Sequence, residues 1–171
     1  MKKELDEALC RDFPVLYRER NESMRVTCLC WGFPGDGWHT LIRELSATIE
    51  NIVHNARNHA IYEYKKTKNL DYSVTLSPEI LKELNIDEMG VVATQVKEKF
   101  GTLRFYYSAN HLNERAYGEV SGAVEFAEAM SAHICEDCGN PGLTNSNGWL
   151  STRCESCRSI ADAKYIKDCT T

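Results

Sequence analysis

The sequence of 171 residues lacks any apolar stretch long enough to span a membrane. A membrane-spanning helix needs about 18 or more consecutive apolar residues, and no run here approaches that length. The opening segment, MKKELDE, is charged where a secretory signal peptide would have its apolar region. We therefore expect no membrane association and a location in the cytoplasm.

Sequence signatures of enzymes and of nucleotide-binding loops are also missing. The chain contains neither GxxxxGK[ST] nor GxGxxG, and it has no HExxH motif or nucleophile elbow. His54 and His59 are five residues apart on an expected helix, a spacing that does not direct both imidazoles to one metal ion. No catalytic constellation is visible, and the sequence favours a role other than catalysis.

Basic residues are too few for a general binder of nucleic acid or acidic membranes. Lysine and arginine number 20 against 25 aspartates and glutamates, which gives a formal net charge of -5. A nucleic-acid partner would therefore need a local basic patch. The composition, 43% hydrophobic and 26% charged, is otherwise that of a globular protein. A chain of this length buries roughly 70% of its unfolded surface, which is enough for a hydrophobic core.

What the sequence has in excess is cysteine, with eight residues. Four of them form two Cys-x-x-Cys pairs separated by fifteen residues: Cys135, Cys138, Cys154 and Cys157. This spacing is typical of a four-thiolate zinc site, and Gly139 supplies the tight turn that follows the second thiol. Because all four ligands are protein thiolates, no coordination position is left for water, and we expect one structural Zn²⁺.

The other four cysteines are scattered along the chain: Cys10, Cys28, Cys30 and Cys169. A reducing cytoplasm disfavours disulfides. Cys28 and Cys30 lie on one face of an expected strand, but single buried thiols are common in protein cores, and we assign no second metal site to them.

The segment around the four paired cysteines has the order of a small zinc module. A knuckle at 135–142 is followed by a return strand at 149–152, and the second cysteine pair leads into a helix at 158–167. This order resembles a zinc ribbon or a treble-clef finger, over about 35 residues. We therefore predict two domains, a core at 1–132 and a four-cysteine module at 133–171.

The rest of the chain predicts an α+β core built on one long helix. Apolar residues recur every three or four positions over 37–65, with Asp36 as the expected N-cap. Alternation over 91–108 predicts a β-hairpin that turns at Phe100-Gly101. In a register set by this turn, the residues expected on the buried face are Val92, Thr94, Val96, Leu103, Phe105 and Tyr107.

Shorter elements complete the expected core. An N-terminal helix is interrupted at Pro14, and alternation predicts strands at 24–30 and 72–76. A short helix over 80–85 has Pro78 at its first helical position. A further helix covers 113–130 and directs four residues inward: Tyr117, Val120, Val124 and Ala127. The fold class is thus α+β, with a long central helix packed on a small antiparallel hairpin.

A glycine-rich loop precedes the long helix and offers a candidate ligand site. The residues that would form it are Gly35, Gly37, Trp38 and His39. Free N–H groups at a helix start favour an anion, and an indole could stack on a planar ring. The alternative is a tight turn into the helix, with the tryptophan in the core.

The hairpin adds a second candidate group. Its register places Lys97 opposite Arg104 with Tyr106 beside them, a pairing of cations and an aromatic ring that suits a nucleotide or a single strand. Like charges across a ladder repel unless an anion lies between them. That anion could be a phosphate, an acidic partner surface or a carboxylate of this chain, with Glu63, Glu98 and Glu114 as candidates. A solvated basic face is the alternative.

Three stretches together resemble a group of uncharacterised proteins encoded by bacteriophages and mobile elements: GDGWHTLIRELSATIENI, QVKEKFGTLRFYY, and CEDCG with GWLSTRCESC. The resemblance spans roughly residues 30–160. It implies a phage origin, with action in the host cytoplasm, rather than a particular mechanism.

Three functions follow as hypotheses. The first is sequestration of a phosphate-containing small ligand, such as a nucleotide immune signal, in an anti-defence role. The second is a zinc-finger adaptor or inhibitor that binds a host protein. The third, a nucleic-acid-binding regulator, is disfavoured by the net charge. The oligomeric state is left open.

Overall fold

The computed structural model describes residues 1–22, 35–146 and 148–169. Its elements, in chain order, are α1 (Lys3–Asp12), the 3₁₀ turn η1 (Asp36–Trp38), α3 (His39–Thr67), α4 (Pro78–Glu83), β1 (Gly90–Lys99), β2 (Thr102–Asn110), α5 (Glu114–Ser131), β3 (Leu143–Thr144), β4 (Thr152–Arg153) and α6 (Glu155–Cys169). The strand expected at 24–30, and with it Cys28 and Cys30, lies outside the described residues. The described helices include none with the length and apolar character that a bilayer crossing requires.

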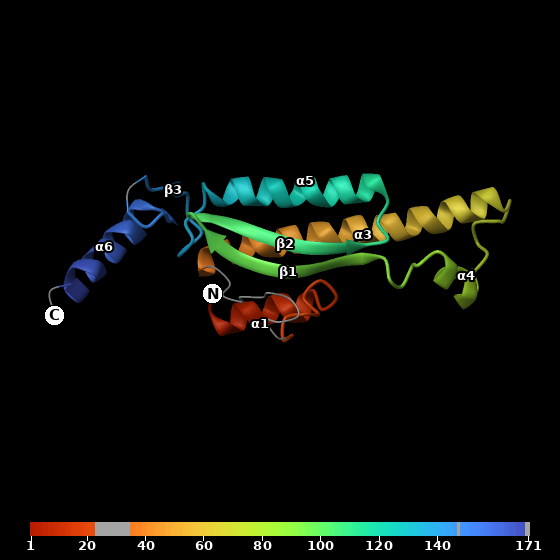
Figure 1. Ribbon diagram of the computed structural model, residues 1–171, viewed down its shortest axis with the longest axis horizontal. Helices are drawn as coiled ribbons and strands as arrows, with labels where there is room; N and C mark the ends of the chain where they lie inside the picture. The colour runs from red at the N-terminus through yellow and green to blue at the C-terminus, as the bar shows by residue number, and fades with distance from the viewer. Residues whose placement is uncertain (23–34, 147, 170–171) are drawn as a thin grey trace.

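The fold is α+β, as predicted, with the long helix α3 packed on the β1–β2 hairpin (Figure 1). Figure 1 shows α3 behind the two strands, α5 along the β2 edge and α1 on the side of β1. The buried positions of α3 recur at helical spacing: Ile42, Leu45, Ile49, Val53 and Ala56. Most of them belong to one core cluster that also takes in residues of α1, of the hairpin and of α5. This hydrophobic contact provides the main stabilisation of the helix.

The outer edge of β2 is covered by polar side chains of α5. The N–H of Leu103 donates to Oγ of Ser131 at 2.8 Å, and the N–H of Phe105 donates to Oε1 of Glu128 at 2.8 Å. Glu128 and Ser131 are three residues apart on the helix, so both face the strand. These bonds satisfy N–H groups that a two-stranded sheet would otherwise leave unpaired at its edge.

From the turn back to Gln95 on β1, the pairing of the two strands is as predicted. Phe100 and Gly101 form the turn with φ values of 57° and 78°, as a two-residue type I′ turn requires. Lys97 lies opposite Arg104. A bulge at Thr94 then shifts the pairing, so that Val92 faces Ser108 and no longer shares the expected face with Tyr107. Its neighbour Ala93 donates its N–H to the carbonyl of Leu16, a contact that sequence patterning could not reveal.

Five local expectations were wrong. Asp36 does not cap α3, because its Oδ1 accepts a hydrogen bond from the backbone N–H of Lys2 at 2.6 Å instead. Residues 72–76 form no strand, since Oδ1 of Asp71 binds both the N–H and the hydroxyl of Ser73 and so closes a turn. Tyr117 faces outward with 53% of its surface exposed. The return strand covers only β4, which begins at Thr152, and helix α6 begins at Glu155.

Candidate metal centre

The four paired cysteines meet at one point of the structure. The Sγ atoms of Cys135, Cys138, Cys154 and Cys157 all lie within 4.8 Å of one another. Four thiolates this close would repel each other strongly unless a cation lay between them, and a tetrahedral thiolate set is the one that structural zinc prefers. The cluster could therefore hold a metal ion, and its donor atoms suit zinc.

Local backbone geometry presents the first pair of thiols. The N–H of Cys135 donates to the carbonyl of Asn140 at 2.7 Å, and the N–H of Gly139 returns to the carbonyl of Cys135 at 2.9 Å. Gly139 has a φ of 79°, a conformation that favours glycine. The predicted knuckle turn is thus present, and it directs both thiols of this pair to the same side.

The second pair lies where β4 passes into α6. Cys154 follows the end of the strand directly, and Cys157 lies in the first turn of the helix. The N–H of Arg158 donates to the carbonyl of Cys154 at 3.0 Å and so continues the helical turn across the pair. Knuckle, hairpin and helix follow one another in the predicted order.

The charge states of the thiols differ. Burial alone would raise the pKa of Cys135, but the N–H groups of Cys154, Cys138 and Asp137 stabilise its thiolate and lower the pKa to about 7. The pKa of Cys157 is raised, chiefly because its thiol shares hydrogen bonds with Cys138 and Cys154. The thiol of Cys135 therefore loses its proton more readily than that of Cys157, and a bound cation would favour the thiolate form of all four cysteines.

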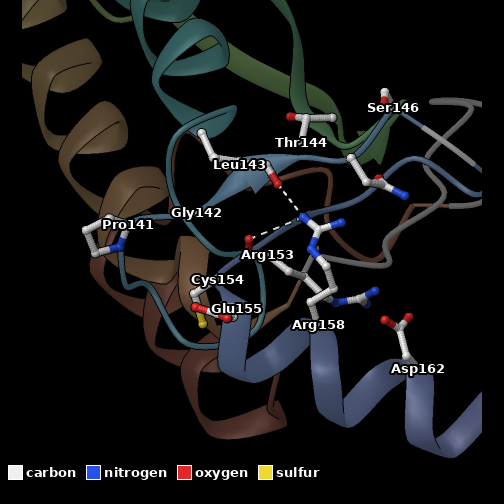
Figure 2. A pocket seen from close by; sticks show the side chains of 11 residues that line it. Pro141, Gly142, Leu143, Thr144, Ser146, Arg153, Cys154, Glu155, Arg158 and Asp162 are labelled. Atoms are coloured by element: carbon white, nitrogen blue, oxygen red, sulfur yellow. Dashed lines mark hydrogen bonds between the residues drawn. The ribbon is translucent and has the colours of Figure 1, made fainter.

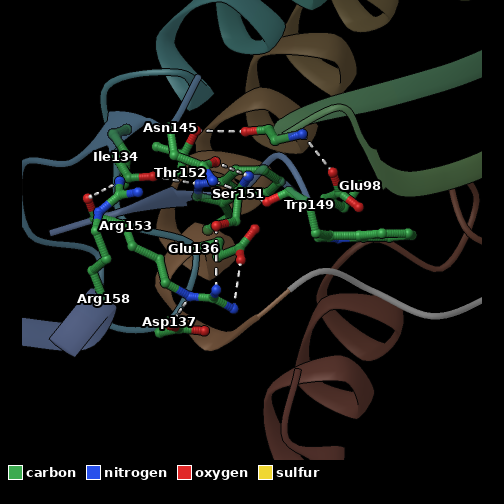
Figure 3. Close-up of polar contacts among 12 residues, drawn as sticks. Glu98, Ile134, Glu136, Asp137, Asn145, Trp149, Ser151, Thr152, Arg153 and Arg158 are labelled. Atoms are coloured by element: carbon green, nitrogen blue, oxygen red, sulfur yellow. Dashed lines mark hydrogen bonds and ion pairs between the residues drawn. The ribbon is translucent and has the colours of Figure 1, made fainter. Parts of the chain in front are cut away.

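Arg153 joins the two halves of the cysteine cluster (Figure 3). Its Nε donates to Oδ2 of Asp137 at 2.6 Å, its Nη2 lies 3.0 Å from Oε1 of Glu136, and its Nη1 donates to the hydroxyl of Ser151. The two acids lie between the first two cysteines, and Arg153 directly precedes the third. The sequence analysis did not predict these ion pairs. The available signal was a basic residue directly before the second cysteine pair together with two acidic residues inside the first.

The glycine-rich loop packs directly against the backbone of this knuckle and does not form an open anion site. The N–H of Gly37 donates to the carbonyl of Glu136 at 2.9 Å. A Cβ on Gly35 would lie 2.1 Å from that same carbonyl oxygen, and one on Gly37 would lie 2.1 Å from the carbonyl oxygen of Cys135. The two glycines therefore allow close approach of protein backbone, and the N–H of Gly37 is not available to a phosphate.

Trp38 is likewise part of the core. Its side chain is 0% exposed, and its indole N–H donates to the carbonyl of Ile134 at 2.7 Å. Of the two alternatives considered from the sequence, the core position of Trp38 is the one observed, and its indole is not open to a ligand. His39 begins α3, and its Nε2 is buried without a hydrogen-bond partner among the described residues.

The electrostatics of this region also disfavour an anion. A pocket of about 520 Å³ opens beside Gly37, and its lining includes the carboxylates of Asp36 and Glu44 together with Cys138. Nζ of Lys2 lies 3.3 Å from Oδ2 of Asp36, and Nη1 of Arg43 lies 3.3 Å from Oε1 of Glu44, so these two cations already have carboxylate partners that a phosphate would have to displace. The charges around this pocket thus give no support to an anion site at the start of α3.

The hairpin turn makes a second contact with the four-cysteine module. The hydroxyl of Thr152 donates to the carbonyl of Gly101 at 2.6 Å (Figure 3), and a Cβ on Gly101 would lie 2.8 Å from Cγ2 of Thr144. The division of the chain at 132/133 stays a prediction. The two parts nevertheless pack on each other at the glycine-rich loop and at the hairpin turn.

The hairpin cations have partners within the chain. Nη1 of Arg104 lies 3.9 Å from Oε2 of Glu128 and donates to the hydroxyl of Thr102. The carboxylate that accompanies Arg104 is therefore none of the three considered from the sequence. Nζ of Lys97 lies 5.5 Å from the ring centroid of Tyr106. A ligand-binding role for Lys97, Arg104 and Tyr106 stays a prediction.

Two further pockets border the module. One of about 830 Å³ lies between the β3 segment and α6, where Nη2 of Arg158 braces the structure by donating to the carbonyl of Leu143 at 2.7 Å (Figure 2). The other, of about 430 Å³, lies between the hairpin turn and residues 148–150. Two aromatic side chains beside it are open to solvent, Phe100 at 64% and Trp149 at 86%. Sequence patterning placed Trp149 in a strand and missed this exposure.

Comparisons with known proteins add no relative: no family model matches the chain, and no curated protein or solved structure is similar to it. The resemblance to phage-encoded proteins therefore stays a prediction. The chain's own residues carry the conclusion that this is an α+β protein with a four-cysteine centre that could hold a metal ion, zinc by its donor set.

Proposed function

We propose that this chain is a zinc-containing binding protein that contacts another protein through the surface formed by its hairpin turn and its four-cysteine module. The observation that carries the proposal is the donor set itself, four thiols within 4.8 Å. Zinc held by four thiolates has no position for water, so its role is to stabilise structure rather than to catalyse. A protein of this kind acts through the surface that the metal stabilises.

The surface beside the metal centre fits this role. Phe100 and Trp149 are large aromatic side chains left exposed around one pocket. Exposed aromatic residues beside a concavity are characteristic of protein interfaces, where tryptophan is among the residues that contribute most to affinity. In the phage setting that the sequence resemblance implies, the partner would be a host defence or transcription protein.

Sequestration of a phosphate-containing ligand, such as a nucleotide immune signal, is the second candidate. It is carried by Lys97 and Tyr106, whose cation and ring lie 5.5 Å apart on the hairpin. The glycine-rich loop no longer contributes to it. Mass spectrometry of small molecules that co-purify with the chain separates the two candidates, because a retained nucleotide would favour the second one.

The metal is the first point to test. Elemental analysis of the purified chain is expected to give about one zinc ion per molecule. Cys138→Ser removes one of four ligands from an exposed position of the cluster. We expect this variant to lose most of its zinc under mild chelation, because the energy of structural zinc binding depends on the full ligand set. A metal-free native protein with intact tertiary structure would contradict the proposal.

The binding role is tested by photo-crosslinking in the cells that encode the chain. A photoreactive phenylalanine analogue at position 100 is expected to form adducts with a partner protein. The matched control carries the analogue at position 126, since Phe126 is similarly exposed but lies on α5. Equal adducts from both positions, or none from position 100, would count against a binding surface at the hairpin turn.

A further inference from the structure

We infer that the pocket between the hairpin turn and residues 148–150 binds a short acidic segment of a partner protein, with an apolar side chain in the pocket and carboxylates on Lys97 and Lys99. This inference rests on the proposed function and names the chemistry of the partner. The pocket is lined by Glu98, Lys99, Phe100, Gly148, Trp149 and Leu150.

The apolar half of the site is exposed and held in place. Phe100 has a φ of 57°, a left-handed conformation that bulky residues rarely adopt and that Asn would adopt more easily. An exposed aromatic residue kept in an unfavourable conformation indicates a role other than folding. Beside it, the carbonyl of Trp149 accepts a hydrogen bond from Nδ2 of Asn145 at 3.0 Å, which fixes the backbone that carries the indole. Such pre-ordering lowers the entropic cost of binding.

The basic half of the site consists of two lysines on one face of β1. Lys97 and Lys99 are two residues apart on a strand, so their side chains leave the sheet on the same side. Their ammonium groups lie 5.5 Å and 5.2 Å from the rings of Tyr106 and Phe100. Within the described ranges, neither lysine is paired with a carboxylate. Both charges are thus available to a partner.

The nearest acidic side chain, Glu98, leaves β1 on the side opposite to the two lysines, because it lies between them on the strand. Glu98 lines the pocket, but its Oε1 accepts a hydrogen bond from the N–H of Gly101 at 2.5 Å (Figure 3). This bond turns the carboxylate toward the turn of the hairpin. Arg104, the third cation of the hairpin, already lies against Glu128. On their own face of β1 the two lysines therefore present two positive charges, while the charge of Glu98 lies on the other face.

The charge of the whole chain favours a peptide over a nucleic acid. Binding to a phosphate backbone commonly uses about six to ten cationic contacts, and this patch has two lysines. The net charge of -5 disfavours a long polyanion. A short segment with one or two carboxylates and an apolar anchor needs only the two lysines and the pocket.

The test is selection of random twelve-residue peptides displayed on phage against the zinc-loaded full chain. We expect the enriched peptides to combine an aromatic or large aliphatic residue with at least two Asp or Glu residues. For one synthesised peptide, Trp149→Ala and the double variant Lys97→Gln with Lys99→Gln are each expected to weaken binding at least tenfold. Lys97→Arg with Lys99→Arg keeps the charge and is expected to bind within about threefold of the parent.

Matched controls separate a local effect from a general one. Phe126→Ala removes an equally exposed aromatic residue on α5, and Lys82→Gln removes an exposed lysine on α4. Both are expected to leave peptide binding unchanged. Zinc content and the far-ultraviolet circular dichroism spectrum verify that each variant is folded.

Several outcomes would overturn the inference. These are a selection that enriches no peptide, peptides without an excess of acidic residues, unchanged binding to Trp149→Ala, and tighter binding of a dT₁₂ oligonucleotide than of the peptide. A partner that crosslinks to position 100 but is indifferent to the lysine substitutions would also overturn it. In that case the proposed function stands. Absence of any crosslinked partner would instead count against the proposed function itself.

Discussion

Gly37 is the residue that decides how closely the long helix and the metal knuckle can approach. An added Cβ there would lie 2.1 Å from the carbonyl oxygen of Cys135 and 2.4 Å from the nitrogen of Gly139. Both neighbours are backbone atoms of the knuckle, which cannot move without displacing the thiols. The constraint on this position is therefore steric and arises from a contact about 100 residues away in the sequence.

We predict that Gly37→Ala destabilises the protein by about 1–3 kcal/mol, the usual cost of overpacking, and also weakens zinc retention. Urea unfolding and zinc content measure the two effects. Gly118→Ala is the matched control, because nothing lies within 4 Å of a Cβ at that helical position. It should instead raise stability by about 0.5–1 kcal/mol, the helix preference of alanine over glycine. Equal effects of the two substitutions would show that close contact between Gly37 and the knuckle does not limit stability.

Arg153 acts on the metal centre through the two acids that it holds. Residues that orient ligands without touching the metal typically change metal affinity by about 10–100-fold. We predict that Arg153→Gln loses zinc to a competing chelator at least tenfold faster than the parent chain, with the four thiols intact. Arg115→Gln, which removes an exposed ion pair with Glu119 on α5, is expected to change nothing. A parental rate of zinc loss in Arg153→Gln would leave Arg153 with no role in the centre.

At the scale of elements, the hairpin turn has an aromatic residue at a position where another residue type would make the protein more stable. Its first residue, Phe100, occupies a left-handed position where asparagine is preferred in two-residue turns. We predict that Phe100→Asn stabilises the free protein by about 0.4–1 kcal/mol and raises its melting temperature, while it weakens the selected acidic peptide at least fivefold. Thermal unfolding and peptide titration measure the two effects. A loss of stability without loss of binding would contradict this reading of the turn.

Periodicity predicted those elements whose pattern is local. The long helix, the hairpin with Lys97 opposite Arg104, and the helix capped by Asn113 all follow from spacing and from turn residues. The bulge at Thr94 could not be predicted, because it accompanies a hydrogen bond from Ala93 to Leu16, which is distant in sequence. Residues 72–76 have β-forming side chains, but a preceding aspartate closes a turn instead.

The candidate site likewise has a part that the sequence predicted and a part that it did not. Cysteine spacing predicted which four thiols gather, since ligand geometry is nearly independent of the surrounding fold. The sequence could not decide between a ligand role and a core position for Trp38, because a glycine-rich stretch suits an anion site and a close backbone contact equally well. Only the position of the knuckle carbonyls distinguishes the two. Exposure of Trp149 likewise depends on tertiary packing.

At the scale of the whole molecule, metal removal is expected to loosen the module while most of the helical core persists. The core cluster is formed by α1, α3, the hairpin and α5, and the cysteines are not among its buried members. Dialysis against a strong chelator should therefore lower the melting temperature but retain most of the far-ultraviolet signal. In a background where Trp31 and Trp149 are both replaced by phenylalanine, Trp38 is the one remaining tryptophan of the chain, and its emission should shift to longer wavelength as it loses its contact with Ile134. Complete unfolding, or an unchanged spectrum, would contradict this division of roles.

The hydroxyl of Thr152 has a further consequence, because it joins the hairpin turn to the strand that precedes Cys154. A partner that binds only when the hairpin turn and the four-cysteine module are docked on each other selects the same conformation that zinc stabilises. Thermodynamic linkage then requires reciprocity: whatever factor zinc adds to the partner's affinity, the partner adds to the affinity for zinc. Partner binding would consequently slow zinc loss, and zinc-poor conditions would release the partner without any competing ligand.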